Sequence, residues 1–162
     1  MTRWLVLLAL AAGCGASATT EIVLSVDTDL EVGVALKGVR ISVTEPPESP
    51  LHGTELFSLP CIAIGSGAGR RAPPLTLGVY REPSATSDRF TAIARGYDDA
   101  GCQAASVVAQ SATTQFVSGA RALLELHLLS ACLAAACVGE GRTCRSAADV
   151  CVSDEEPARS AD

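Results

Sequence analysis

The feature that most constrains the fold is a series of short segments in which apolar residues alternate with polar ones. In the stretch 21–27, Ile22, Leu24 and Val26 fall on one side of an extended chain, because successive side chains of a strand point to opposite faces. The same period of two recurs at 39–43, 75–79, 90–94 and 122–128. Prolines and glycines separate these segments, and no long helical period lies between them. This pattern predicts an all-β chain.

The number and spacing of the segments indicate the architecture. Two further strands are predicted within 55–64 and 102–110, which makes about seven short strands. This pattern is typical of an immunoglobulin-like β-sandwich, predicted here over 21–130. The Cys…Trp…Cys hallmark of true immunoglobulin domains is absent, because Trp4 is the only tryptophan and lies before the first strand. The segment 121–137 also fits an amphipathic helix, but its alternation favours a strand to Leu129 followed by a helical turn over 131–136.

Composition limits which residue types can form the core and which partners are expected. Hydrophobic residues make up 48% of the 162 residues, and aromatic residues only 4%, so the core must be built mainly from aliphatic side chains. The formal net charge is −6, and the sequence contains no basic stripe. Nucleic acid is therefore not an expected partner.

The first residues have the pattern of a secretory leader. Arg3 precedes an uncharged apolar stretch over 4–12, which is shorter than the ~20 residues needed to span a bilayer. The stretch 10–14, LAAGC, resembles a bacterial lipobox, although Ala11 stands where that pattern usually has leucine. The resemblance implies a signal peptide over 1–13 and a lipidated tether over 14–20, with Cys14 as the acylated first residue. Gly15, in place of aspartate, favours the outer membrane; the alternative is an ordinary signal peptide cleaved near Ala18.

Six cysteines remain once Cys14 is assigned to lipid, and an even number in an exported chain predicts disulfide bonds. Cys61 and Cys102 are expected to pair. In the Cys-rich segment 131–152, two pairings are open: Cys132–Cys144 with Cys137–Cys151, or Cys132–Cys137 with Cys144–Cys151. Zinc is disfavoured because no CxxC pair occurs. The residues 153–162 contain no large apolar side chain and are predicted to form a disordered acidic tail.

The sequence carries no strong catalytic, cofactor-binding or metal-binding motif. The glycine-rich stretch 65–71, GSGAGRR, lacks the spacing of a phosphate-binding loop and is predicted to be a flexible surface loop. His52 and His127 are the only histidines, and no nucleophile motif accompanies them. The acidic pairs Asp27–Asp29 and Asp98–Asp99 are a weak calcium signal. We therefore predict no enzyme activity, no cofactor and no metal.

Taken together, the sequence resembles a group of uncharacterised lipoproteins of myxobacteria and related bacteria. The resemblance rests on AAGC, on VDTDL followed by GVRISVT, and on FVSGARALLELHLLSAC running into CVGEGRTCRSAADVC. It implies an immunoglobulin-like domain at the cell surface or facing the periplasm, and no established activity.

The function predicted from these features is that of a non-enzymatic, lipid-anchored envelope protein with a structural or protein-binding role. The membrane is reached through the lipid, and the protein partner is unknown. The alternative is a carbohydrate-binding or accessory module of an envelope complex. Sugar sites stack rings on sugar faces, so that alternative would be favoured if Tyr80 and Tyr97 formed one exposed cluster, whereas scattered rings would favour a protein partner.

Overall fold

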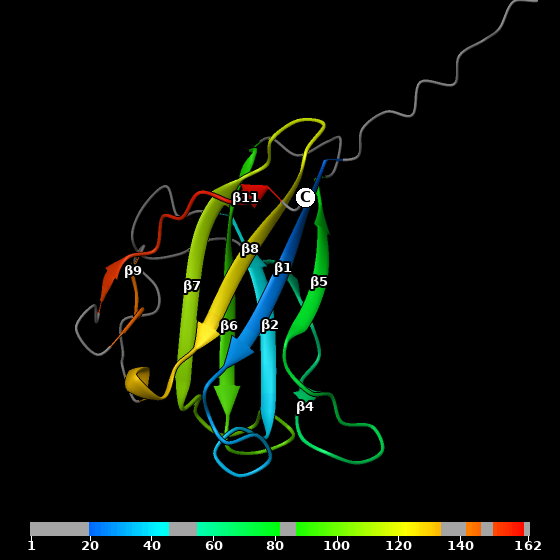
Figure 1. Ribbon diagram of the computed structural model, residues 1–162, viewed down its shortest axis with the longest axis vertical. Coiled ribbons are helices and arrows are strands. Elements are labelled where there is room, and N and C mark those ends of the chain that lie inside the picture. Colours follow the sequence, from blue (N-terminus) through cyan, green and yellow to red (C-terminus); the bar gives the residue numbers. More distant parts are fainter. Residues whose placement is uncertain (1–19, 46–54, 82–86, 134–141, 147–150, 161–162) are drawn as a thin grey trace, which may run out of the picture.

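The protein folds as two β-sheets packed face to face, with a short C-terminal segment along one side (Figure 1). The structure is a computed structural model that describes residues 20–45, 55–81, 87–133, 142–146 and 151–160. Its elements in chain order are β1 (Glu21–Thr28), β2 (Gly38–Thr44), β3 (Glu55–Ser58), β4 (Ile62–Ala63), β5 (Leu75–Tyr80), β6 (Arg89–Tyr97), β7 (Val108–Gln115), β8 (Arg121–Leu128), the 3₁₀ turn η1 (Ser130–Cys132), β9 (Arg142–Thr143), β10 (Val152–Ser153) and β11 (Arg159–Ser160).

The strand order of the two sheets is β5-β1-β8-β11 and β3-β2-β6-β7, with β4 also paired to β2. Strands β1 and β8 run parallel, and the other pairs within the two sheets are antiparallel. The prediction of an all-β sandwich with a small disulfide-linked C-terminal segment is confirmed. The immunoglobulin-like subtype stays a prediction, and β1 and β2 lie in opposite sheets.

The core lies between the sheets and follows the alternation of the sequence. Ile22, Leu24 and Val26 of β1 are at most 2% exposed, and the alternating leucines of β8 pack beside them. The second sheet contributes aliphatic residues from β2 and small alanines from β6 and β7. Phe90 is the large ring of the core, and its centroid lies 4.9 Å from that of Phe116. The aliphatic core predicted from composition is therefore present.

Two predicted strands have different bounds in the structure. The strand predicted over 102–110 begins only at Val108, because Asp99 accepts hydrogen bonds from backbone N–H groups in a turn over 99–104. Cys102 within that turn has a φ of 52°, which no strand residue adopts. The stretch 55–64 forms two short strands, β3 and β4, rather than one.

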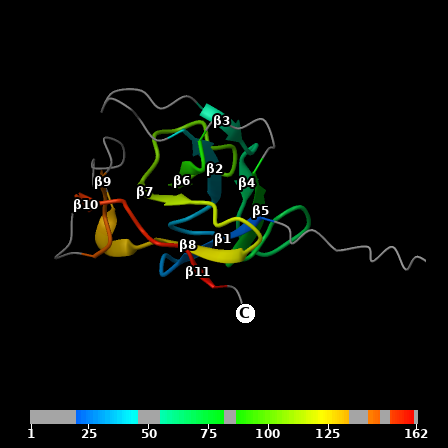
Figure 2. The ribbon, with the colours of Figure 1, turned by 90° about the horizontal axis from the view of Figure 1, so that it is seen from above.

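The C-terminal segment is ordered over the residues that the structure describes. The N–H of Thr113 donates to the carbonyl of Asp154, the N–H of Glu156 donates to the carbonyl of Thr113, and β11 pairs with β8. The prediction of a disordered tail is therefore wrong for 153–160. The edges of β7 and β8 present unpaired backbone groups, and this segment satisfies them although it contributes little apolar surface. Figure 2 shows β9, β10 and β11 along this side of the sandwich, which we call the closed side.

Two disulfide bonds join described residues, Cys61–Cys102 and Cys132–Cys144. The first is the expected pair. The second agrees with the interlocked pairing of the C-terminal cysteines and excludes the alternative, which needs Cys132 bonded to Cys137. Cys137 itself lies outside the described residues, as do the predicted signal peptide and Cys14.

Candidate functional site

The side of the sandwich opposite the C-terminal segment is formed by two edge strands. Strand β5 pairs with β1 alone among the described strands, and β3 and β4 pair only with β2 (Figure 2). Natural edge strands are usually protected by charged side chains, by proline or by bulges. The sequence of β5, LTLGVY, contains none of these protective residues, and its register with β1 is continuous. We call this side the open side.

The first hollow of the open side is an apolar groove between β3 and β5. Its volume is about 600 Å³, and its walls include Leu77, Val79, Phe90 and Phe116. It lies toward the end of the sandwich where β1 begins, because Tyr80 of β5 pairs with Glu21. We call this end the N-terminal end and the hollow the N-terminal groove. Leu77 and Val79 point toward the core but are only partly buried, since no strand of the described residues covers β5 on this side.

A second hollow of about 720 Å³ continues along β5 toward the opposite end, and we call it the far groove. Leu77 lines both grooves, so the two adjoin. One wall carries Ile62 of β4, and the rim carries the exposed Arg71. The open side therefore combines an unprotected strand edge, apolar walls and a cationic rim.

The glycine-rich stretch 65–71 forms the rim of the far groove and is held by hydrogen bonds. The N–H of Gly65 donates to the carbonyl of Arg71, and the Arg71 N–H donates to the carbonyl of Ala63. The guanidinium of Arg70 donates to the carbonyl of Ile64 at 3.0 Å. The surface position predicted for this loop is correct, and these hydrogen bonds connect it to β4 and to its own ends.

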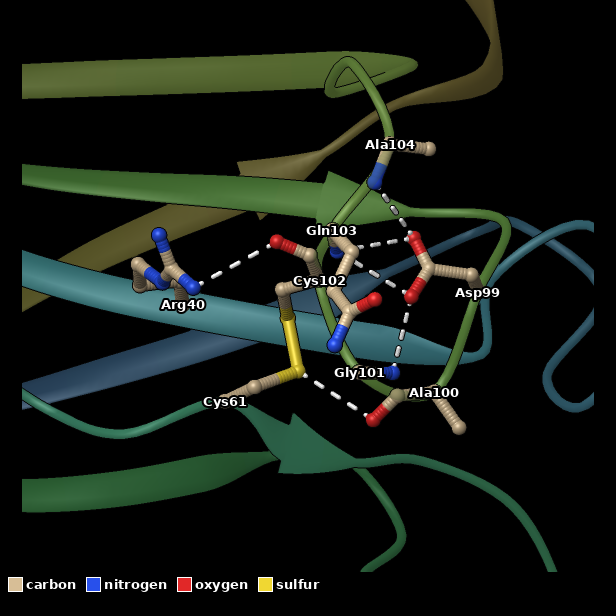
Figure 3. The surroundings of a disulfide bond; sticks show 8 residues. All are labelled: Arg40, Cys61, Asp99, Ala100, Gly101, Cys102, Gln103 and Ala104. Atoms are coloured by element: carbon tan, nitrogen blue, oxygen red, sulfur yellow. Dashed lines mark hydrogen bonds between the residues drawn. A yellow bond between two sulfur atoms is a disulfide. The ribbon is translucent and has the colours of Figure 1, made fainter.

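The Cys61–Cys102 bond attaches the wall of the far groove to the loop after β6 (Figure 3). In that loop the N–H groups of Ala104 and Gln103 donate to the Asp99 carboxylate and lower the pKa of Asp99. The Arg40 guanidinium donates to the Cys102 carbonyl at 3.3 Å. These contacts position Cys102, and the disulfide then holds Cys61 and the start of β4 in place.

Tyr80 is an exposed ring that is held firmly at the N-terminal end. Its hydroxyl donates to the Glu21 carboxylate at 2.8 Å, and its ring atoms lie over Gly78, where a Cβ would be 3.1 Å away. The hydrogen bond to Glu21 and the charge of that carboxylate raise the pKa of Tyr80. Glu21 also pairs with Arg121 at 3.2 Å. The ring is thus a fixed surface feature, 59% exposed.

The two tyrosines do not form a common exposed platform. Tyr97 is only 6% exposed and lies in the last position of β6, beneath the guanidinium of Arg40. It pairs with Gly38 at the far end of the sandwich, whereas Tyr80 lies at the N-terminal end. This arrangement corresponds to the scattered rings that favour a protein partner over a sugar.

His127 lines a small cavity of about 270 Å³ between β8 and the C-terminal segment. Its neighbouring carboxylates form ion pairs, Glu125 with Arg159 at 3.6 Å and Glu156 with Arg145 at 3.4 Å. No hydroxyl or thiol side chain is among the described residues that line this cavity. The cavity therefore does not bring a nucleophile to His127, and His52 lies outside the described residues.

Three of the four aspartates of the weak calcium signal cap local backbone or side-chain groups. Asp29 accepts from the hydroxyl of Ser130 at 2.9 Å, Asp27 accepts from the N–H of Thr28, and Asp99 closes the turn described above. Within the described part of the chain, no group of three or more His, Cys, Asp or Glu side chains is placed to hold a metal ion.

The grooves were not predicted from the sequence, although one feature of β3 indicates them. Leu56 and Phe57 are adjacent in β3, so both cannot face the core of a two-layer sandwich. In the structure they are 55% and 47% exposed. Two adjacent large apolar residues in a strand thus mark apolar surface that the core does not absorb.

Comparisons with protein-family models, curated proteins and solved structures found no match to this chain. In the described residues, no helix has the length and apolar character needed to cross a membrane.

Proposed function

We propose that this chain is a non-enzymatic, lipid-anchored envelope protein that binds a partner protein along the open side of its sandwich. The observation that carries the proposal is the difference between the two sides. The closed side has its strand edges paired by the C-terminal segment, whereas β5 on the open side leaves its outer edge uncovered by any described strand beside two adjoining grooves.

An extended segment of a partner is the ligand that such a surface fits best. A strand added to an exposed edge forms main-chain hydrogen bonds, and its alternate side chains enter pockets. Here the inward side chains of an added strand would cover Leu77 and Val79, which are only partly buried in this chain. An acidic residue of the partner would meet Arg71 at the rim of the far groove.

Location in the envelope is supported by the leader sequence and by the disulfides. Disulfide bonds persist in oxidising compartments outside the cytosol, and two join described residues here. The acyl anchor at Cys14 rests on the lipobox resemblance. Two or more acyl chains hold a protein stably on a membrane. The carbohydrate-binding alternative has less support, because Tyr97 is buried apart from Tyr80.

Site-specific photo-crosslinking in the native host tests the binding role. A photoreactive amino acid replaces Thr76, which is exposed on β5, and in a matched variant it replaces Asp27, which is exposed on the outer face of β1. We expect a discrete crosslinked protein from position 76 and none from position 27. Equal crosslinking at both positions, or none at either, would contradict the assignment of the open side. The intact mass of the membrane-extracted protein tests the anchor separately.

A further inference from the structure

Four of the seven large apolar side chains that are exposed among the described residues lie at the N-terminal end of the sandwich. These are Val117, Leu56, Phe57 and Tyr80, at 54%, 55%, 47% and 59% exposed, whereas Val32 and Val34 lie at the opposite end and Leu133 follows η1. An exposed apolar cluster on a folded domain usually marks a surface that contacts another molecule or a membrane. These residues are therefore expected to contact another molecule or a membrane.

Strand pairing shows that these residues share one end. Phe57 pairs with Val43, next to the last residue of β2, and Tyr80 pairs with Glu21 at the start of β1. Val117 lies in the turn between β7 and β8, which Figure 1 shows at the same end as the start of β1.

The turn that carries Val117 is joined directly to the residue at which the described chain begins. The N–H of Gly119 donates to the Thr20 hydroxyl at 2.9 Å, and the N–H of Glu21 donates to the Ala120 carbonyl at 3.1 Å. Thr20 is only six positions after Cys14, so even a fully extended tether would span about 20 Å. An acyl anchor at Cys14 would hold this end, and not the opposite one, near the bilayer.

Charge at this end is compatible with a lipid surface. Three carboxylates there pair with arginines: Glu21 with Arg121, Asp88 with Arg81, and Glu155 with Arg89. Glu45, which follows β2, and Glu55, which begins β3, add two more carboxylates at this end. Among the described residues, the ion pairs thus neutralise three of the five carboxylates named here. Tyrosine is also suited to an interfacial position, because its ring is apolar and its hydroxyl stays hydrated.

We infer that the N-terminal end is a membrane-contacting face, with Val117, Phe57 and Tyr80 in the interfacial region of the bilayer. This inference rests on the proposed lipid anchor. It also gives the molecule an orientation on the bilayer: the long direction of the strands points away from the membrane surface. The edge of β5 then faces sideways, where a partner in the same membrane can reach it.

Tryptophan fluorescence provides the test, because Trp4 belongs to the predicted signal peptide and the mature chain would contain no other tryptophan. The variants Val117→Trp and Val34→Trp are expressed as the full chain, extracted from membranes, and reconstituted into phosphatidylcholine vesicles with or without brominated lipid. Val34 is a matched control: it is 59% exposed and lies between β1 and β2 at the opposite end. Strand β6, nine residues long, spans about 30 Å between the two ends.

We expect the emission of Val117→Trp to shift to the blue and to be quenched by brominated lipid, and that of Val34→Trp to show neither effect. An acylated, vesicle-bound protein in which neither tryptophan is quenched, or in which position 34 is quenched, would overturn the membrane face and leave the anchor intact. An intact mass without acyl chains would refute the anchor, and with it this orientation.

Discussion

Removing the Cys61–Cys102 bond should destabilise the domain more than removing the Cys132–Cys144 bond. A disulfide stabilises a protein largely by restricting the unfolded chain, and the effect grows with the length of the closed loop. The two bonds have sequence separations of 41 and 12 residues. The chain-entropy relation then gives about 4 kcal/mol for the first bond and about 3 kcal/mol for the second.

The perturbation is best made with the paired variants Cys61→Ala/Cys102→Ala and Cys132→Ala/Cys144→Ala, because removing both partners leaves no unpaired thiol. For a domain of this size, 1 kcal/mol corresponds to about 2–4 °C in Tm. We therefore expect the first variant to melt about 8–16 °C below the parent. Urea unfolding of the purified mature chain followed by circular dichroism gives the free energies of unfolding.

The order of the two effects is the critical result. Cys132 and Cys144 are 1% and 0% exposed, whereas Cys102 is 5% exposed and Cys61 lines a groove, so a packing-dominated effect would reverse the order. A larger loss for the Cys132/Cys144 variant would refute the argument from loop length. An unchanged Tm for the Cys61/Cys102 variant would show that the bond does not constrain the unfolded chain.

Three further predictions follow from local contacts. Gly38→Ala should lower the free energy of unfolding by about 1–3 kcal/mol, because a Cβ there would lie 2.5 Å from the Asp99 carbonyl oxygen. Gly101→Ala, whose nearest contact would be 3.4 Å, serves as the tolerated control in the same urea titration. Asp99→Asn should flatten the acid dependence of stability. Because folding lowers the pKa of Asp99, its contribution is fully present above the unfolded pKa of about 3.9 and is lost as pH falls through the folded value. If the urea midpoints of the parent and of Asp99→Asn fall equally between pH 6 and pH 2.5, the stabilising role of the Asp99 carboxylate is contradicted. Truncation after Ser153 should uncover the edges of β7 and β8 and cause concentration-dependent self-association. Light scattering of this variant beside one truncated after Ser160 checks it, and two monomeric proteins would argue against an edge-protecting role.

The strands of the sandwich core could be predicted because their signal is local. Alternation places Ile22, Leu24 and Val26 on one face whatever lies opposite them, and burying that face is the main driving force. The number of cysteines likewise restricted the possible bonds, and the expected Cys61–Cys102 pair is present. The bounds of β7 were not predictable in this way, because a single carboxylate, Asp99, keeps the preceding residues in a turn.

The partners of each strand and the fate of the C-terminal segment were decided only by the tertiary structure. Alternation marks a buried face but does not say which strand lies beside it, so the parallel pairing of β1 with β8 could not be read from either segment. The segment 153–160 has little apolar content, and its order comes from backbone groups that β7 and β8 leave unpaired. The open side also depends on strand order. No described strand lies beyond β5, so Leu77 and Val79 stay partly uncovered. Which faces are apolar follows from the order of the residues alone. Only the folded chain determined which of those faces, and which strand edges, remain available to a partner.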